Sequence, residues 1–227
     1  MEGPSKTHGK RIFLVDDHPM VRDRLAQLVE QQSDLTVCGE ADNVTDALNG
    51  ICASLPDIAI VDLSLKNSNG LELIKDIKAR GLQTPVLVLS MHDENLYAER
   101  ALRAGALGYV NKQETSQVIL HAIRRVIDGQ IHVSPEISAI LMKRALGRSE
   151  ATDHSPASRL GDRELEVFQL IGRGLGTRKI AETLGISIKT VETYRARIKE
   201  KLGIADAVQL LRAAMQWVQK YDSDAPE

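Results

Sequence analysis

Aromatic side chains and cysteines are scarce in this sequence. Only 3% of the 227 residues are aromatic, so the hydrophobic cores must be built mainly from Leu, Ile, Val and Ala. Hydrophobic residues still make up 43% of the chain, which is enough for ordinary globular cores. Cys38 and Cys52 lack the spacing of a metal site, so we expect reduced thiols that pack as small hydrophobic groups.

A long apolar run is also missing. No stretch approaches the roughly 20 apolar residues that are needed to span a bilayer. The polar and basic start of the chain is followed by an apolar stretch at residues 12–15, which is far too short for the core of a signal peptide. We therefore expect a cytoplasmic protein that has no membrane partner.

The net charge of -2 conceals an asymmetry between the two halves of the chain. Residues 11–129 carry 12 Lys and Arg against 17 Asp and Glu, whereas residues 160–220 carry 11 against 7. An acidic half followed by a basic half is typical of a signalling module joined to a nucleic-acid-binding module. Charge alone does not distinguish this arrangement from chance.

The first half alternates short apolar runs with segments of helical periodicity. We expect strands over residues 11–15, 35–40, 58–61, 86–90 and 108–110, and helices over residues 19–32, 44–55, 71–80, 94–104 and 115–128. Five strands that are each followed by a helix predict an α/β fold with a doubly wound, five-stranded parallel sheet. Such a sheet gathers its functional groups at the carboxyl ends of its strands.

The rest of the chain is expected to contain helices and one linker. Residues 135–146 have helical spacing, and the polar residues 147–158 are expected to be flexible. Four short helices are expected over residues 163–172, 177–184, 188–202 and 206–219. We therefore divide the chain into an α/β domain at 10–130, a linker with a short helix at 131–159 and an all-α four-helix domain at 160–220.

Acidic residues follow two strands that should be neighbours in the sheet. Asp16 and Asp17 come directly after the first strand, and Asp62 comes directly after the third. Three converging carboxylates would repel one another and raise their own pKa values unless a cation compensates them. Mg2+ suits such a site, because it needs only one or two carboxylates together with waters and a phosphoryl oxygen.

Two further side chains reach the same edge of the sheet. Ser90 ends the fourth strand and Lys112 ends the fifth. A nucleophilic carboxylate, a metal ion, a fixed cation and a hydroxyl group together suit phosphoryl transfer onto a carboxylate. A single acid after a strand is usually a solvated loop residue, and the prediction therefore depends on the whole set.

These side chains lie in motifs that resemble the receiver domain of response regulators, over about residues 10–130. The motifs are Val15-Asp-Asp-His-Pro19, Val61-Asp-Leu-Ser64 with Asn69-Gly70-Leu71, Leu89-Ser-Met91 and Gly108-Tyr-Val-Asn-Lys112. The resemblance implies a flavodoxin-like fold in which Asp62 is the phosphoacceptor. It also implies that Mg2+ is held by Asp16, Asp17, Asp62 and the carbonyl group of Ser64.

The same resemblance implies roles for three more side chains. Lys112 is expected to pair with the phosphoryl group. Ser90 and Tyr109 match the family's coupled switch pair, in which the hydroxyl group moves to the phosphate and the aromatic ring turns inward. Phosphorylation is therefore expected to reshape the nearby helix face and to shift a monomer–dimer or closed–open equilibrium.

The segment Ala181-Glu-Thr-Leu-Gly-Ile-Ser187, followed by Thr190-Val191, has the pattern of a helix-turn-helix. Ala181 lets two helices approach closely, Gly185 makes the turn, and Ser187 caps the second helix. The longer pattern resembles the four-helix LuxR-type DNA-binding domain and includes Arg163-Glu164, Val167, Leu170, Ile180, Leu184, Ile198 and Lys201-Leu202. The whole chain thus resembles the NarL/FixJ family of response regulators.

Three departures from the family pattern lie in this domain. Gly161 stands where Thr is usual, so Asp162 is expected to supply the helix cap instead. Glu192 stands where Lys is common, and Tyr194 stands where His is common.

The expected recognition helix spans residues 188–202. On a helical projection, Val191, Ile198 and Leu202 share one face and are expected in the core. The residues expected to contact DNA are Lys189, Thr190, Glu192, Thr193, Arg195, Ala196 and Arg197. The cations among them should bind phosphates, whereas Glu192, Thr193 and Ala196 should contact base edges. The open alternative is that Glu192 only forms a surface ion pair with Lys189 or Arg195.

The expected function is that of a response regulator. A cognate histidine kinase is expected to phosphorylate Asp62 and thereby to control homodimerisation and binding to double-stranded DNA at an inverted repeat. RNA polymerase is a candidate further partner. Apolar residues of the last helix either form a dimer surface or only cover the core, namely Val208, Leu211, Met215 and Val218.

Two other classes of protein compete with this expectation. An aspartyl phosphatase of the haloacid dehalogenase type needs a second Asp at the position of Ser64, so we expect no enzyme that turns over outside substrates. The receiver only assists its own phosphorylation and dephosphorylation. An adaptor whose last helices bind protein is disfavoured by the basic balance of that domain.

Overall fold

The five apolar runs of the first half form one parallel sheet, in the order β2-β1-β3-β6-β7. These strands are β1 (Lys10–Val15), β2 (Leu35–Ala41), β3 (Ile58–Val61), β6 (Val86–Ser90) and β7 (Gly108–Asn111). The computed structural model describes residues 9–65, 68–146 and 156–222. It divides into two units, Met1–Gly147 and Arg148–Glu227. The expected five-stranded parallel sheet is confirmed.

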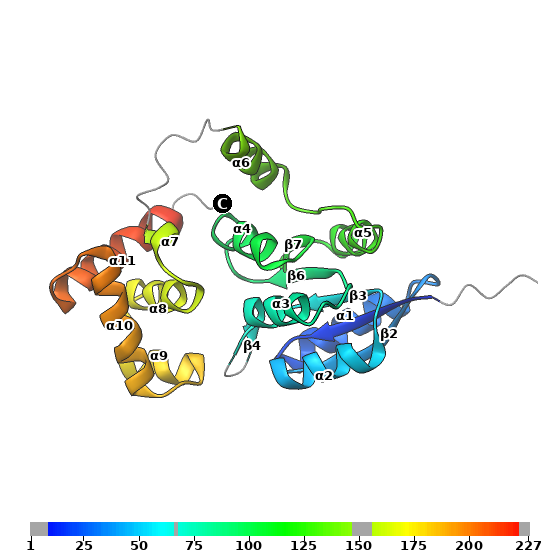
Figure 1. The fold of residues 1–227 in the computed structure, drawn as a ribbon, viewed down its shortest axis with the longest axis horizontal. Coiled ribbons are helices and arrows are strands. Elements are labelled where there is room, and N and C mark those ends of the chain that lie inside the picture. The colour runs from blue at the N-terminus through cyan, green and yellow to red at the C-terminus, as the bar shows by residue number, and fades with distance from the viewer. Residues whose placement is uncertain (1–8, 66–67, 147–155, 223–227) are drawn as a thin grey trace, which may run out of the picture. The chain divides into compact units, whose positions relative to one another are not determined.

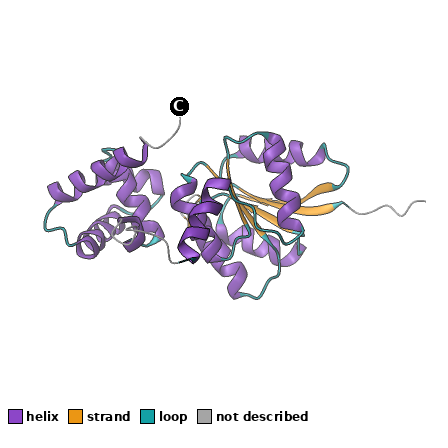
Figure 2. Ribbon diagram, turned by 90° about the horizontal axis from the view of Figure 1, so that it is seen from above, coloured by secondary structure: helices purple, strands orange, loops and turns teal. Residues whose placement is uncertain are grey.

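Helices cover both faces of this sheet (Figures 1 and 2). They are α1 (Pro19–Glu30), α2 (Val44–Ser54), α3 (Gly70–Ala79), α4 (Glu94–Ala104) and α5 (Ser116–Ile127). α1 and α5 bury their apolar sides in one common cluster, whereas α2, α3 and α4 pack side by side. The expected bounds of these elements differ from the observed ones by at most two residues.

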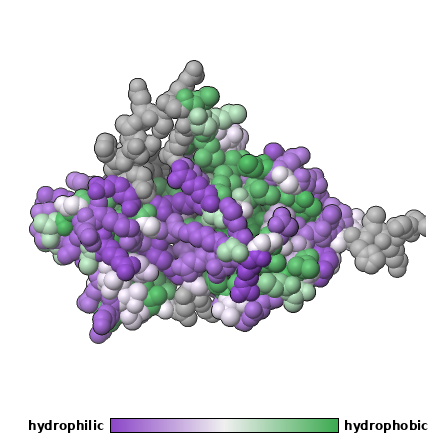
Figure 3. Space-filling view, in the orientation of Figure 1, coloured by the Kyte–Doolittle hydropathy of each residue, from purple (hydrophilic) through white to green (hydrophobic). Residues whose placement is uncertain are grey.

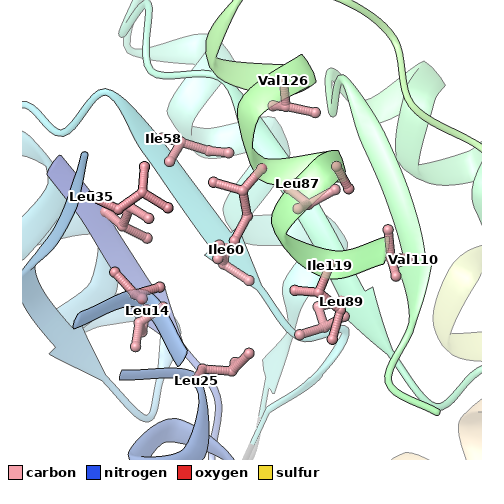
Figure 4. Packing of buried hydrophobic residues seen from close by; sticks show 14 residues of the cluster. Leu14, Leu25, Leu35, Ile58, Ile60, Leu87, Leu89, Val110, Ile119 and Val126 are labelled. Atoms are coloured by element: carbon pink, nitrogen blue, oxygen red, sulfur yellow. The ribbon is translucent and has the colours of Figure 1, made fainter. Parts of the chain in front are cut away.

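Burial on both faces of the sheet explains why the strands of the first unit are unbroken apolar runs in the sequence. All four residues of β3 are buried, because helices cover both faces of a parallel sheet. In Figure 4, Ile58 and Ile60 of β3 lie among Leu87, Leu89 and Leu14 of the neighbouring strands. Branched aliphatic side chains fill this core, as the scarcity of aromatic residues predicts.

A two-stranded hairpin follows β3 and was not predicted. β4 (Ser64–Leu65) pairs antiparallel with β5 (Ser68–Asn69), and residues 66 and 67 lie outside the described part of the chain. The side chain of Asn69 then caps α3 by accepting the backbone N–H of Leu71 at 2.8 Å. Strands of two residues are too short to show a periodicity, so pattern alone could not predict them.

The chain after α5 returns to the edge of the sheet. His132 forms an isolated parallel bridge with Gly108 of β7, and α6 (Pro135–Ala145) then packs against α4. Most of the expected flexible linker, residues 147–155, lies outside the described residues. Residues 156–158 do not fit that expectation, because they belong to the short helix α7 (Pro156–Arg159).

The second unit is helical, as expected. Its four longer helices are α8 (Asp162–Gly172), α9 (Thr177–Leu184), α10 (Ile188–Leu202) and α11 (Ala207–Asp222). α8 packs against both α10 and α11, and the rings of Phe168 and Trp217 lie 5.6 Å apart in this core. None of the described helices of either unit is long and apolar enough to cross a membrane.

Candidate functional site

The carboxyl ends of β1, β3 and β7 bring two acids and one base together. Asp16 and Asp62 are buried, with 2% and 3% of their surface exposed. The Nζ atom of Lys112 lies 2.6 Å from Oδ2 of Asp16 and 2.7 Å from Oδ2 of Asp62. A single ammonium group therefore bridges the two carboxylates.

Asp17 and His18 complete an acidic cluster beside this bridge. Nδ1 of His18 lies 2.7 Å from Oδ1 of Asp17 and 3.4 Å from Oδ1 of Asp16. Ligand atoms of these three residues and of Asp62 all lie within 4.8 Å of one another. His18 was not among the predicted site residues. Its position directly after Asp17 in the sequence could have indicated that it lies at the site.

The charges in this cluster do not balance. Burial raises the pKa of Asp62 above its ordinary value; attraction by Lys112 opposes this without cancelling it, and repulsion by Asp16 adds to it. Burial alone would lower the pKa of Lys112, but attraction by Asp62 and Asp16 outweighs burial and leaves that pKa raised. Lys112 therefore stays protonated, whereas the ionised form of Asp62 would be stabilised by a further positive charge nearby.

The oxygen atoms of this cluster suit Mg2+. Oδ1 of Asp62 is buried and accepts no hydrogen bond from any residue that the structure describes. Buried polar atoms are normally paired, so this atom calls for a partner such as a cation or an incoming phosphoryl group. Carboxylate oxygens are the ligands that a hard divalent cation prefers.

Gly70 lets α3 begin directly against the loop of Asp62. The N–H of Gly70 donates to the carbonyl oxygen of Leu63 at 2.9 Å. A Cβ atom at Gly70 would overlap the carbonyl oxygen of Asp62 and approach the Cα atom of Leu63 to 2.9 Å. The sequence contained Gly70 within a motif, but only the contact reveals why a side chain is excluded.

The side chains of Ser90 and Tyr109 lie within hydrogen-bonding reach of each other. Ser90 is fully buried, and the hydroxyl group of Tyr109 donates to the carbonyl oxygen of His92 at 2.9 Å. Burial raises the pKa of Tyr109 well above its ordinary value, so its phenol remains a hydrogen-bond donor at neutral pH. The ring already has the inward position that the receiver resemblance associates with the phosphorylated form.

His92 links this pair to the rim of the pocket. Its Nε2 atom lies 2.9 Å from Oγ of Ser64, and its backbone N–H donates to Oγ of Ser90 at a long 3.4 Å. Its ring also lies 4.5 Å from the ring of Tyr97 in α4. Sequence reasoning did not single out His92, because no pattern marks a loop residue whose partners come from three elements.

The residues expected to contact DNA lie on α10 of the second unit. Lys189, Glu192, Thr193, Ala196 and Arg197 are exposed, whereas Thr190 and Arg195 are half-buried. The visible face of this unit in Figure 3 is largely hydrophilic. Side chains on this outer face are therefore available to a partner.

The inner face of α10 agrees with the helical projection in two of three positions. Val191 and Ile198 are buried, but Leu202 in the last turn is only partly covered, so the expectation of a core position for Leu202 is wrong. Oγ of Ser187 accepts the N–H of Thr190 at 3.0 Å and caps the helix as expected.

Glu192 has no ion pair with Lys189 or Arg195 in the described part of the chain. Ion pairs in this unit join other residues, such as Lys179 with Glu182 and Lys201 with Glu164. The geometry therefore gives no support to the alternative in which Glu192 only balances a surface cation.

A buried carboxylate fastens the end of α10 to the start of α8. Oε2 of Glu164 lies 2.6 Å from Nζ of Lys201 and accepts the N–H of Gly161 at 2.8 Å. The expected cap by Asp162 is wrong: the N-cap residue is Gly161, and Asp162 is already the first residue of α8. The reason is that Glu164 reaches back to the orphan N–H of the cap.

Comparison with known proteins covers both units. Residues 12–124 match the family model of the response regulator receiver domain, and residues 158–214 match that of bacterial regulatory proteins, luxR family. The virulence-factor transcription regulator BvgA of Bordetella pertussis is 32% identical over 204 residues, which cover 90% of this chain and 96% of that protein. The response regulator UvrY of Escherichia coli O157:H7 is 32% identical over 206 residues, or 90% and 93% of the two chains.

Solved structures also resemble this chain. One is RcsB from Salmonella enterica serovar Typhimurium, bound to the promoter rprA in the presence of the phosphomimetic BeF3-. It is 27% identical, has a TM-score of 0.61, and covers 92% of this chain and 99% of its own. The likeness thus extends across both units.

Proposed function

Because the chain belongs to the NarL/FixJ response regulators, which join a receiver domain to a LuxR-type DNA-binding domain, we propose that a cognate histidine kinase phosphorylates Asp62 and so controls dimerisation and DNA binding. As a two-component response regulator, the protein regulates transcription. One observation supports Asp62 above all. Lys112 holds one of its carboxylate oxygens, while the other is buried without a partner in the described residues.

The roles of the other pocket residues follow from their positions. We propose that Asp16, Asp17, Asp62 and the carbonyl group of Ser64 hold Mg2+, which when bound neutralises the oxygens of the incoming phosphoryl group. Lys112 stays charged and pairs with the transferred group. Ser90 and Tyr109 act as the switch pair.

Further parts of the proposal concern the chain as a whole. We place the receiver at residues 10–130, the linker at 131–159 and the DNA-binding domain at 160–220. The protein acts in the cytoplasm, turns over no outside substrate and meets RNA polymerase at its promoters. The family matches to residues 12–124 and 158–214 support the first and last of these ranges, and the division of the chain between Gly147 and Arg148 falls within the linker.

An apolar stripe on α11 supports a dimer of the DNA-binding domain. Val208, Leu211 and Met215 are 70%, 40% and 42% exposed and recur every three or four residues. Val218 is buried and belongs to the core, which is the alternative left open for these residues. We propose that the three exposed side chains contact a second copy of the chain.

Phosphorylation should therefore drive dimerisation through α11. With acetyl phosphate and Mg2+, the wild-type protein should form dimers and bind DNA more tightly. Met215→Lys should weaken the dimer by about tenfold or more, because a charge would be buried in the apolar contact. Sedimentation velocity and DNA titration measure both effects. Gln216→Lys, which adds the same charge at an exposed neighbouring position, is the control.

Measurements on the wild type and on the two variants contradict different parts of this prediction. Equal sedimentation and equal DNA affinity with and without the phosphodonor would refute control by phosphorylation. Equal dimerisation of Met215→Lys and Gln216→Lys would refute the α11 contact alone.

Glu192 should read one base in each half-site of an inverted repeat, with half-sites about 10 base pairs apart. A carboxylate can accept from the amino group of cytosine but is repelled by the acceptors of guanine. Glu192→Lys should therefore change base preference at one position per half-site by roughly 1–3 kcal/mol. Arg197→Ala should instead weaken all sites nearly uniformly and flatten the salt dependence. Selection of binding sites in vitro measures both, and identical selected motifs for the wild type and Glu192→Lys would mean that Glu192 reads no base.

A further inference from the structure

The start of α6 is tied to the start of α4 by one side chain. The backbone N–H of Ser134 donates to Oε1 of Glu94 at 2.9 Å. Oγ of Ser134 in turn accepts the N–H of Ile137 at 3.2 Å and so caps α6, while the side chain of Ile137 is buried. Glu94 therefore holds the residue from which α6 begins.

The residues just before α6 are fastened to β7. The N–H of Tyr109 donates to the carbonyl oxygen of His132 at 2.9 Å, and the N–H of His132 donates to that of Leu107 at 3.0 Å. Gly108 makes this approach possible, because a Cβ atom there would lie 3.1 Å from the carbonyl oxygen of His132 and 2.8 Å from Cδ1 of Leu87. The segment thus bonds directly to the backbone of Tyr109.

The two anchors of this segment, Tyr109 and Glu94, lie on the two parts of the chain that the hydroxyl bond of Tyr109 connects. Tyr109 belongs to β7, and the carbonyl oxygen that accepts its hydroxyl group belongs to His92, two residues before Glu94. A rotation of the Tyr109 ring would break its bond to His92, which lies next to the start of α4. If the loop of His92 and the start of α4 shift when this bond is lost, the distance between the anchor on β7 and the anchor on α4 changes with them.

We propose that Glu94 is a positioning residue that couples the state of the Ser90–Tyr109 pair to the docking of α6. The inference rests on the proposed function, since it assumes that the pair responds to a phosphoryl group at Asp62. α6 docks on α4 when Tyr109 is inward, as in this structure, and is released when Tyr109 leaves. The first structural element after the receiver is in this way controlled by the pocket.

Thermodynamic reciprocity makes this coupling measurable without DNA. If a phosphoryl group favours docking of α6, docking must favour the phosphoryl group by the same factor. Removing the bond between Glu94 and Ser134 should therefore weaken binding of a phosphoryl mimic in a pocket that contains neither residue. A purely structural role of Glu94 would not produce this effect.

The experiment uses the full chain with Mg2+ and BeF3-. Glu94→Ala removes the acceptor, whereas Glu94→Gln removes the charge but keeps an acceptor oxygen. We expect Glu94→Ala to bind BeF3- about fivefold or more weakly than the wild type, with Glu94→Gln close to the wild type. Ser134→Ala, which removes the α6 cap without touching α4, should weaken binding in the same direction. Arg103→Ala removes an exposed ion pair within α4 and should have no effect.

Two readouts are measured on each variant. Calorimetric titration gives the affinity for BeF3-, and hydrogen exchange gives the protection of α6 amides with and without it. In the wild type, BeF3- should raise the protection of α6, and in Glu94→Ala it should not. Equal BeF3- affinities in the wild type, Glu94→Ala and Ser134→Ala would overturn the inference and leave the proposed function standing. No binding of BeF3- to the wild type would overturn both.

Discussion

Asp62→Asn will abolish phosphorylation by acetyl phosphate. In the wild type, a carboxylate oxygen of Asp62 is expected to form a bond to phosphorus while the bond from phosphorus to the acetate oxygen breaks, and acetate leaves with the electron pair. An amide oxygen at this position is a poor nucleophile. Among the described residues, Asp16 is the only other carboxylate that pairs with Lys112. Intact-mass measurement should show one phosphoryl group on the wild type and none on the variant.

Asp57→Asn is the matched control for this experiment. Asp57 directly precedes β3, whereas Asp62 directly follows it, so the two acids lie at opposite ends of one strand. The carboxylate of Asp57 accepts the backbone N–H of Arg11 and the ammonium group of Lys10. The control should therefore be phosphorylated like the wild type, with the acid lability of an acyl phosphate. Full, acid-stable phosphorylation of Asp62→Asn would remove Asp62 from its assigned role.

Gly70→Ala should damage both the stability and the chemistry of the receiver. The new methyl group would meet the carbonyl oxygen of Asp62 and the Cα atom of Leu63, which are backbone atoms that cannot rotate away. We expect a loss of stability of about 3 kcal/mol, at the upper end of overpacking effects. Displacing the nucleophile by about 1 Å should also slow phosphorylation by on the order of 100-fold.

Urea unfolding and initial rates with acetyl phosphate test these two effects. Gly176→Ala is the control, because a Cβ atom at Gly176 would meet nothing within 4 Å and its backbone φ of -75° suits any residue. Because Gly176 is the N-cap of α9 and Ala caps less well than Gly, the control should lose at most about 1 kcal/mol of stability and leave the phosphorylation rate unchanged. A Gly70→Ala protein with wild-type stability and rate would show that the backbone near Asp62 yields freely.

Most of the pocket could be predicted because its residues lie at regular places. Asp16, Asp62 and Lys112 each follow a strand, and the edge where parallel strands end gathers such residues whatever the loops do. The bounds of α9 and α10 were predicted to the residue, because Gly185, Ser187 and Gly203 terminate or cap these helices by local rules.

The features that could not be predicted depend on contacts between distant segments. The bond between Ser64 and His92 joins residues 28 positions apart, and the bond between Ser134 and Glu94 joins residues 40 positions apart. No periodicity reports such pairs. Leu202 was misplaced for a related reason: a helical projection gives the direction of a side chain but not how far the neighbouring helices extend.

The single tryptophan of the chain lies in the DNA-binding unit, next to Phe168 and nearly buried. Fluorescence excited at the red edge of aromatic absorption will therefore come from that unit alone. Unfolding of the first unit, which contains the sheet, will not change this signal. Far-UV circular dichroism detects both units. Recording the two signals in one thermal scan will separate two melting events within an unlabelled chain, and coincident curves would mean that the units unfold together.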